Sequence, residues 1–510
     1  MKGLATTLLL GIACAGCTEK LDQPERTQSL HVVVTDVNGA PIDPSAPPLP
    51  LPAGEVDLGF IVEALRPDGT RDTGFNGFAR VSAVPGTVVQ IAGPCASGRN
   101  VLLLNGVAEC PPAPPDAHRA IVRNARGATR IWAEDIGYVP EDPGKPPACA
   151  NGSDDDGDGN VDFPEDPGCA FANDDSEGPG TFAAGVSQPV RFELPRLGDV
   201  QGRGATSPYE LESVEVKTDL PAELIVTRIA ADGFYATDLS DTLGYNHIFA
   251  FTFNTPPFLR VCDRITKLTG TAVEFFGFTE LSFPSFERHA WRFPTPTDPG
   301  DGPCRVPEPT VIAPDATEDA GLMEKIESAL VRVENVTVGA FFGPNPPEVA
   351  LAPGQNDCAT PPPVIFSDAA SSCDLDGSGF IDFDTKGSCE AACANACGAE
   401  PNCVEWTGFV SRGNYRVVLP GPKSIQINTR SIPGFDPVSM RGKPITSLSG
   451  TLRNFSGGDL NWTIEARCGD DLVCSEMSQK ACADGPKAPV SSQIACVSPR
   501  TTDDPNEASN

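Results

Sequence analysis

The chain reads LIVTRIAADGFYATD over 224–238, HIFAFTF over 247–253 and VCDRITKLTGTAVEFFGFTEL over 261–281. In all three segments β-branched and aromatic residues alternate with polar ones, as they do in strands that bury one face. The alternation predicts a β-rich unit from about Val186 to Phe293.

A second copy of this pattern lies closer to the C-terminus. The heptapeptide ITKLTGT at 265–271 returns as ITSLSGT at 445–451. Repetition of this kind indicates duplicated modules. The second module is expected to begin at IESALVRVENVTV, to continue through NYRVVL and SIQINT, and to close on WTIEARCGDDLV near Cys474.

The first copy resembles the OB-fold modules of secreted bacterial nucleases over roughly seventy residues. The resemblance rests on the order of DGFY at 232–235, DRIT at 263–266, TGT at 269–271 and FGFTE at 276–280. It implies a groove on each barrel face for nucleic acid or oligosaccharide. Aromatic residues that could stack on such a ligand, or fill the barrel core instead, are Phe234, Tyr235, Phe249, Phe251, Phe275, Phe276 and Phe278.

The segment from Ser29 to Pro140 has short apolar runs separated by turn signals. Asn38-Gly39 and Asp68-Gly69 are turn formers, and the proline-rich run from Pro41 to Pro52 is expected to be a loop. This spacing is typical of an all-β sandwich, and it resembles a bacterial immunoglobulin-like domain.

The expected fold class is mainly β and multidomain: an immunoglobulin-like β-sandwich followed by two OB-like β-barrel modules, with calcium-loop and disulfide-rich insertions. The expected divisions are a signal peptide at 1–17, a tether at 18–28, the sandwich at 29–140, a calcium-loop linker at 141–180, the first OB-like module at 181–300, the second at 301–475 with an insertion at 341–405, and a Cys-containing polar tail at 476–510.

An acidic stretch between Cys149 and Cys169 has the ligand spacing of an EF-hand-type calcium loop. Such a loop supplies oxygens from its first, third, fifth, seventh, ninth and twelfth positions, with glycine at the sixth. Gly159 occupies the sixth position and Val161 the eighth, which is expected to be buried. The predicted calcium ligands are Asp154, Asp156, Asp158, the carbonyl of Asn160, Asp162 and Glu165.

This loop resembles those of dockerins and thrombospondin type 3 repeats. No helical pattern flanks it, so we expect a disulfide between Cys149 and Cys169 to close it. The alternative is a solvated acidic linker, which is how most runs of charge behave.

A second such loop is predicted at CDLDGSGFIDFDT. Thr385 stands at the twelfth position, a departure from the motif that predicts weaker binding or a non-binding acidic turn. Its predicted ligands are Asp374, Asp376, Ser378, the carbonyl of Phe380, and Asp382.

The cysteines are spread through every region of the chain. Cys389, Cys393 and Cys397 have helical spacing, which permits an iron–sulfur or zinc cluster but, in an exported chain, favours disulfides. Cys95 and Cys110 flank a hairpin-like segment and are expected to pair. Further disulfide candidates are Cys262, Cys304, Cys468 and Cys474.

The N-terminal sequence MKGLATTLLLGIACAGC resembles a bacterial lipoprotein signal peptide with Cys17 as the lipidated residue. Its apolar run is too short to span a bilayer. Cleavage before Cys14 is the alternative, but lipidation of Cys17 leaves an even number of the 18 cysteines for disulfides. The expected location is the cell envelope, at the outer membrane, through this lipid anchor.

The formal net charge of −32 opposes long-range attraction of nucleic acid and favours bound calcium. The 4 histidines lack a metal-ligand spacing, and no nucleophile elbow, phosphate loop or dinucleotide fingerprint occurs, so no nucleotide cofactor is expected. We therefore expect a calcium-binding, non-catalytic binding or scaffold protein. The alternative is an accessory or degenerate relative of a secreted nuclease that captures nucleic acid or oligosaccharide. Glycans and surface proteins are the other expected ligand classes.

Overall fold

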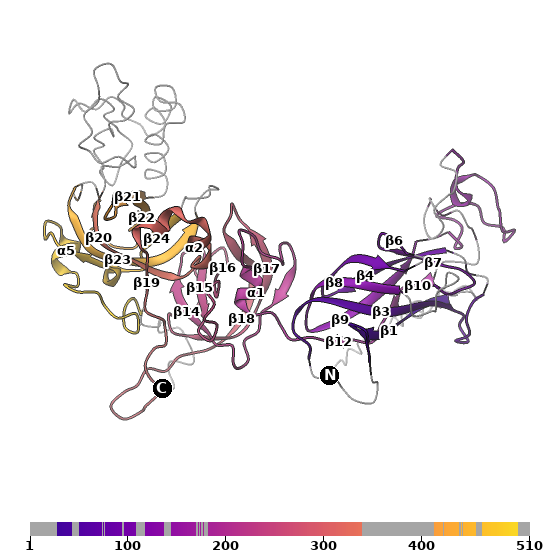
Figure 1. The fold of residues 1–510 in the computed structure, drawn as a ribbon, viewed down its shortest axis with the longest axis horizontal. Helices are drawn as coiled ribbons and strands as arrows, with labels where there is room; N and C mark the ends of the chain where they lie inside the picture. Colours follow the sequence, from indigo (N-terminus) through magenta and orange to yellow (C-terminus); the bar gives the residue numbers. More distant parts are fainter. Residues whose placement is uncertain are drawn as a thin grey trace, which may run out of the picture. The chain divides into compact units, whose positions relative to one another are not determined.

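The computed structural model describes residues 28–42, 50–73, 75, 77–93, 96–108, 118–136, 144–169, 172, 174, 177, 182–338, 413–421, 423–437, 440, 442–454 and 462–497. The chain forms two compact units, Met1–Leu194 and Pro195–Asn510. Both consist mainly of β-strands (Figure 1). The predicted fold class, an immunoglobulin-like sandwich followed by two OB-like barrels, is confirmed.

The first unit is a sandwich of two sheets. One sheet has the order β10-β1-β3-β8-β5 with β2 beside β1, and the other has the order β11-β9-β4-β7-β6 with β12 beside β9. The strands are β1 (Gln28–Val37), β2 (Ala40–Pro41), β3 (Gly54–Leu65), β4 (Gly77–Val84), β5 (Thr87–Ala92), β6 (Ala96–Ser97), β7 (Asn100–Leu103), β8 (His118–Ala125), β9 (Ala128–Asp135), β10 (Phe182–Ala183), β11 (Gly185–Val186) and β12 (Val190–Arg191).

The sandwich core follows from the period of two in its strands. Successive side chains of a strand point to opposite faces, so one set of alternate residues fills the space between the sheets. In β3 these include Leu58, Phe60 and Val62, all of which are buried. Val62 pairs with Val32 of β1, which belongs to the same core.

The acidic segment is an insertion into the sandwich, because the chain returns to the sandwich after it. β10 pairs in parallel with β1, and β11 and β12 pair with β9. The predicted linker at 141–180 and the predicted start of the first OB-like module at 181 are therefore wrong at this boundary. Each returning strand is only two residues long, too short to show an alternating pattern.

The first barrel closes in the order β14-β15-β16-β18-β17 and back to β14, with a parallel pair between β16 and β18. Five strands in this Greek-key order form an OB-like barrel. The strands of this sheet are β13 (Ser213–Glu215), which extends it beyond β17, β14 (Leu224–Ile229), β15 (Gly233–Asp238), β16 (His247–Phe251), β17 (Arg264–Glu274) and β18 (Thr279–His289), and helix α1 (Leu197–Gln201) precedes them.

The second barrel has the same order, β20-β21-β22-β24-β23 and back to β20, again with one parallel pair, β22 and β24. Strands β17 and β23, which hold the repeated heptapeptides, occupy the same place in the two barrels. The elements of this part are β19 (Thr310–Val311), η2 (Pro314–Glu318), α2 (Ala320–Lys325), β20 (Leu330–Val338), β21 (Asn414–Val418), β22 (Ser424–Asn428), β23 (Pro444–Asn454), β24 (Trp462–Glu465), η4 (Gly469–Asp471), β25 (Leu472–Cys474) and α5 (Lys480–Asp484).

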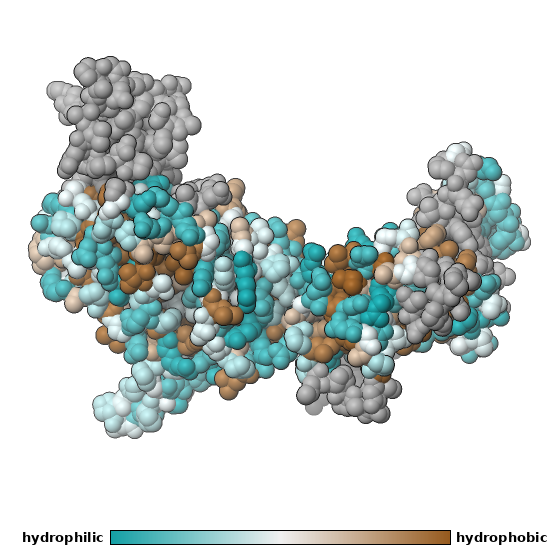
Figure 2. Space-filling view, viewed as in Figure 1, coloured by the Kyte–Doolittle hydropathy of each residue, from teal (hydrophilic) through white to brown (hydrophobic). Residues whose placement is uncertain are grey.

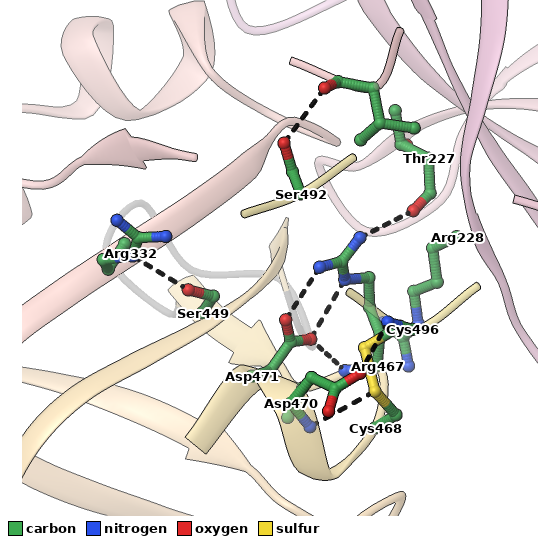
Figure 3. A network of polar contacts seen from close by, with 12 residues as sticks. Thr227, Arg228, Arg332, Ser449, Arg467, Cys468, Asp470, Asp471, Ser492 and Cys496 are labelled. Atoms are coloured by element: carbon green, nitrogen blue, oxygen red, sulfur yellow. Dashed lines mark hydrogen bonds and ion pairs between the residues drawn. A yellow bond between two sulfur atoms is a disulfide. The ribbon is translucent and has the colours of Figure 1, made fainter. Parts of the chain in front are cut away.

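Ion pairs and hydrogen bonds join the two barrels within the second unit. Arg228 Nη1 of the first barrel lies 2.6 Å from Glu465 Oε2 of the second, with both side chains largely buried. Arg467 donates to the carbonyl of Thr227 at 3.3 Å and forms a bidentate ion pair with Asp471 (Figure 3).

Two disulfides attach the C-terminal segment to the second barrel. Cys468 pairs with Cys496 (Figure 3), and Cys474 pairs with Cys482. Ser492 Oγ also donates to the carbonyl of Val306 at 3.0 Å. The described part of the predicted polar tail, which ends at residue 497, is thus held on the second barrel by these bonds. Among the described residues, no helix is long and apolar enough to cross a membrane.

Candidate metal centre

The acidic loop lies between β9 and β10 and contains turns and one short 3₁₀ helix, η1 (Ala148–Ala150). A disulfide joins Cys149 to Cys169, with Cα atoms 5.7 Å apart, as the sequence analysis expects. In Figure 1 the loop is the purple segment that projects beyond the sheets of the first unit, and Figure 2 shows that its surface is largely hydrophilic.

Three predicted ligands converge at the start of the loop. Asp154, Asp156 and Asp158 each place a carboxylate oxygen within 4.8 Å of the other two. Asp154 holds the turn in shape, since Oδ1 accepts from the Gly157 N–H at 2.7 Å and Oδ2 from the Gly159 N–H at 3.1 Å. Gly159 has a φ of +99°, a conformation that favours glycine, which explains the glycine at the sixth position.

Asp162 has a different role in this structure. Its Oδ1 accepts from the Asn151 N–H at 3.0 Å and its Oδ2 from the Gly152 N–H at 2.8 Å, so its carboxylate caps the opening turn. The structure does not bring it into the group formed by the three preceding aspartates. A carboxylate oxygen has a second lone pair, so these bonds leave Asp162 able to bind a cation.

Three other predictions for the loop have mixed outcomes. Asn160 lies two positions after Asp158, the last of the three grouped aspartates, and its N–H donates to Asp158 Oδ1 at 2.8 Å. Glu165 is exposed to solvent. The expected burial of Val161 is wrong, because its side chain is 42% exposed. Among the described residues, no α-helix flanks the loop to cover this side chain, as helices do in a paired EF-hand.

The structure adds two buried carboxylates that the sequence analysis missed. Asp166 and Glu177 are 1% and 2% exposed, and each has a carboxylate oxygen within 4.8 Å of the other and of Cys169 Sγ. Because Cys169 is in a disulfide, only the two carboxylates can act as ligands. Asp166 directly follows the twelfth loop position, a weak signal in the sequence. Glu177 lies outside the motif, so the sequence pattern gives no signal for it.

Glu177 fixes the loop from outside. Its Oε2 accepts from the Asp155 N–H and its Oε1 from the Asp162 N–H at 3.2 Å. One carboxylate therefore connects the first and last parts of the predicted calcium loop. These bonds orient the loop backbone around the aspartates.

Asp166 has an oxygen whose hydrogen-bonding capacity is unused. Its Oδ1 accepts from the Gly168 N–H at 2.6 Å, whereas its Oδ2 is buried with no hydrogen-bond partner among the described residues. Burial raises the pKa of Asp166, and the charges of Asp158, Asp156 and Glu177 raise it further. Negative charge thus accumulates here, and in the part of the chain that the structure describes none of these four carboxylates forms an ion pair.

The aromatic residues proposed for ligand stacking in the first barrel divide into two sets. Phe234, Tyr235, Phe249 and Phe278 are fully buried and belong to the core, whereas Phe275 and Phe276 are exposed. Outside the predicted set, Phe253 and Phe283 are 55% and 74% exposed, and their ring centroids lie 5.2 Å apart. The remaining predicted residue, Phe251, is partly buried, and its ring centroid lies 4.3 Å from that of Phe253 at an interplanar angle of 52°.

Other predicted site residues are partly described. Cys262 pairs with Cys304, while Cys468 and Cys474 pair with partners in the C-terminal segment. The lipidation site, one predicted disulfide pair and the second calcium loop lie outside the described residues, as does the whole Cys-rich insertion at 341–405. The predicted site residues concerned are Cys17, Cys95, Cys110, Asp374, Asp376, Ser378, Phe380 and Asp382.

Comparisons with known proteins do not assign the chain to a family. No known protein family matches it, and no curated protein matches it. One solved structure, the dimeric latent PorU from Porphyromonas gingivalis, is matched at 11% identity and a TM-score of 0.15, over 48% of this chain and 26% of PorU. The chain therefore spans about a quarter of that protein's length, and a likeness at this level carries no argument.

Proposed function

We propose that this chain is a calcium-binding lipoprotein of the cell envelope that acts as a non-catalytic binding or scaffold protein. The observation that carries the calcium site is the Oδ2 atom of Asp166, which is buried without a hydrogen-bond partner among the described residues, while the charges of Asp156 and Asp158 raise the pKa of this carboxyl group. A buried carboxylate oxygen without a partner is costly, and a hard cation satisfies it. The donor set contains only oxygen, which calcium prefers.

In this proposal the cation lies among Asp154, Asp156, Asp158 and Asp166, with Glu177 as a further ligand or as the group that positions the loop. Glu165, the predicted twelfth ligand, contributes little in this proposal because its carboxylate joins neither of the two acidic groups of the loop. The expected dissociation constant is that of extracellular calcium modules, about 10⁻⁴ to 10⁻³ M.

The test is calorimetric titration of the full chain in detergent with calcium, together with melting curves in calcium and in chelator. Calcium should raise Tm, since it binds only the folded loop. Asp154→Asn with Asp156→Asn should remove most of this rise, and Glu177→Gln should reduce it. Glu165→Gln is the matched control and should retain it. A Tm that does not respond to chelator contradicts the proposal.

The envelope location rests on the N-terminal sequence. Cys17→Ala should abolish lipid attachment and release the protein from membrane fractions, because the lipid is the proposed anchor. The measurement is incorporation of labelled fatty acid together with fractionation of the cells. Incorporation that persists in Cys17→Ala would move the anchor elsewhere.

A second candidate function is capture of nucleic acid or oligosaccharide by the OB-like barrels. The observation in its favour is the cluster of Phe251, Phe253 and Phe283, in which the rings of Phe253 and Phe283 are exposed. Aromatic side chains of this kind stack on bases. Fluorescence anisotropy of labelled single-stranded DNA at low salt tests it. Binding that weakens with salt and is lost in Phe253→Ala with Phe283→Ala supports nucleic acid, and no binding at high protein concentration removes it.

A further inference from the structure

A second group of acidic side chains lies inside the second unit, where the two barrels meet. Thr279 of β18 connects two of them: its Oγ1 donates to Glu274 Oε1 at 2.8 Å, and its N–H donates to Glu327 Oε1 at 3.1 Å. Gln201, the last residue of α1, donates from Nε2 to the same Glu327 oxygen. Glu274 ends β17, and Glu327 follows α2, so the group draws on both barrels.

Several oxygens of this group have no hydrogen-bond partner among the described residues. They are Glu274 Oε2, Glu327 Oε2 and Gln201 Oε1, and all three atoms are buried. The Glu327 side chain is 0% exposed and that of Gln201 is 2% exposed. The Gln201 amide nitrogen donates a hydrogen bond to Glu327, so Gln201 Oε1, which belongs to the same amide group, also lies near the Glu327 carboxylate.

The charge of this group is also unbalanced. Burial and mutual repulsion raise the pKa of Glu327 well above its usual range, and burial with the charge of Glu274 raises the pKa of Glu324 to about 7. No ion pair involves these three glutamates among the described residues. Other buried acids in this unit differ, since Asp238 lies 2.7 Å from an Arg196 nitrogen.

We propose that Glu274 and Glu327, together with Gln201 Oε1, form a second binding site for a hard divalent cation such as calcium. Every available donor is an oxygen, and the absence of thiolate or imidazole from the group disfavours zinc. Glu324, whose charge acts on Glu327, is only half-buried, so this member of the group is accessible from solvent. The ion would join the two barrels, since its ligands come from α1, β17 and the segment after α2.

The experiment uses the full chain with both predicted calcium loops disabled by Asp154→Asn, Asp156→Asn, Asp374→Asn and Asp376→Asn. Equilibrium dialysis with radioactive calcium should still show about one bound ion per chain, and magnesium should compete with it. Adding Glu274→Gln and Glu327→Gln should remove this ion. Glu334→Gln in β20, an exposed glutamate, is the matched control and should retain it. Because the loops are disabled, the result does not depend on the first site.

Stability in chelator separates loss of the site from misfolding. The parent in these measurements is the chain with the four loop substitutions. Glutamine has the shape of glutamate without its charge, so adding Glu327→Gln should give a Tm in chelator that is equal to or higher than that of the parent. Calcium should raise the Tm of the parent by several degrees and leave Glu274→Gln with Glu327→Gln unchanged. Equal ion binding by parent and variant, or no ion bound by the parent, overturns the proposal; in the second case protons alone neutralise the group.

Discussion

The carbonyl oxygen of Glu177 lies 1.3 Å from the position that a Cβ atom on Gly168 would occupy. Any larger residue at position 168 must therefore displace the backbone of Glu177. The same backbone carries the carboxylate that accepts from the N–H groups of Asp155 and Asp162. The absence of a side chain at Gly168 thus allows the Glu177 backbone to approach closely, which places the Glu177 carboxylate against the loop. Gly168 itself has no side chain that could bind a cation.

Gly168→Ala should weaken calcium binding at the acidic loop. Groups that orient metal ligands typically change affinity by about 10- to 100-fold when altered. We expect an increase of that size in the dissociation constant measured by calorimetry. Gly204→Ala is the control, because a Cβ there meets nothing within 4 Å. Equal affinity of Gly168→Ala and the parent would show that Glu177 does not position the loop.

The disulfide between Cys149 and Cys169 should likewise support binding. The two cysteines are separated by 20 positions in the sequence. Cross-linking a loop of about this length lowers the chain entropy of its unfolded state, which raises the free energy of that state by about 3 kcal/mol. Cys149→Ser with Cys169→Ser should therefore raise the calcium dissociation constant at least about tenfold, or about 1.4 kcal/mol. Calorimetric titration measures this, and an unchanged constant would mean that the hydrogen bonds of Asp154 and Glu177 suffice to order the loop.

The barrels could be predicted because their signals are local. Alternation marks each strand, and the repeated heptapeptides fall on β17 and β23, which hold the same place in each barrel. The repeated glycine has a physical cause in the second copy. A Cβ on Gly450 would lie 2.3 Å from the carbonyl oxygen of Glu465 in the neighbouring strand, so only glycine fits. In the first copy a Cβ on Gly270 would lie 3.1 Å from Leu281 Cβ, which is also a tight contact, so a residue without a side chain is favoured at both positions.

The remaining site features depend on contacts that no short window contains. Glu177 lies beyond the closing disulfide, so the calcium-loop template cannot include it. Gln201 and Glu327 touch across a sequence separation of 126. The short strands β10 to β12 are defined by their partners β1 and β9 and not by their own residues. Tertiary packing decides each of these cases, which is why sequence patterns missed them.

Arg228 and Glu465 should contribute strongly to the joining of the two barrels. Arg228 also donates to Thr451 Oγ1 at 2.5 Å, and its guanidinium lies 5.4 Å from the centroid of the Tyr235 ring. Removing one partner of a buried pair leaves an uncompensated charge, which costs about 3–5 kcal/mol. Arg228→Met or Glu465→Gln should therefore reduce the free energy of unfolding of the second unit by about that amount.

Arg228→Met combined with Glu465→Gln completes a double-mutant cycle with the two single variants and serves as their control. The double variant should be less destabilised than the sum of the two single changes, because no buried charge is left alone. Urea denaturation of all four proteins gives the coupling free energy. Additive effects would mean that the two side chains act independently.

His118 should make the sandwich less stable in acid. Its side chain is 1% exposed, both ring nitrogens lack a hydrogen-bond partner among the described residues, and its ring packs against Phe60. Burial lowers the pKa of His118, so below about pH 6.5 the unfolded chain binds a proton at this residue more readily than the folded protein does. The unfolded state then binds more protons, and stability falls as the pH decreases from about 7 towards the lowered pKa.

His118→Phe removes this titration while keeping a ring in the core. Calorimetric melts of the first unit between pH 7 and pH 5 should therefore show a smaller decrease of Tm in His118→Phe than in the parent. His31→Gln changes an exposed histidine of the same sandwich and should leave the decrease unchanged. If His118→Phe and the parent lose stability equally over this interval, carboxylates elsewhere in the unit are responsible for the acid sensitivity, because the buried imidazole would then have no part in it.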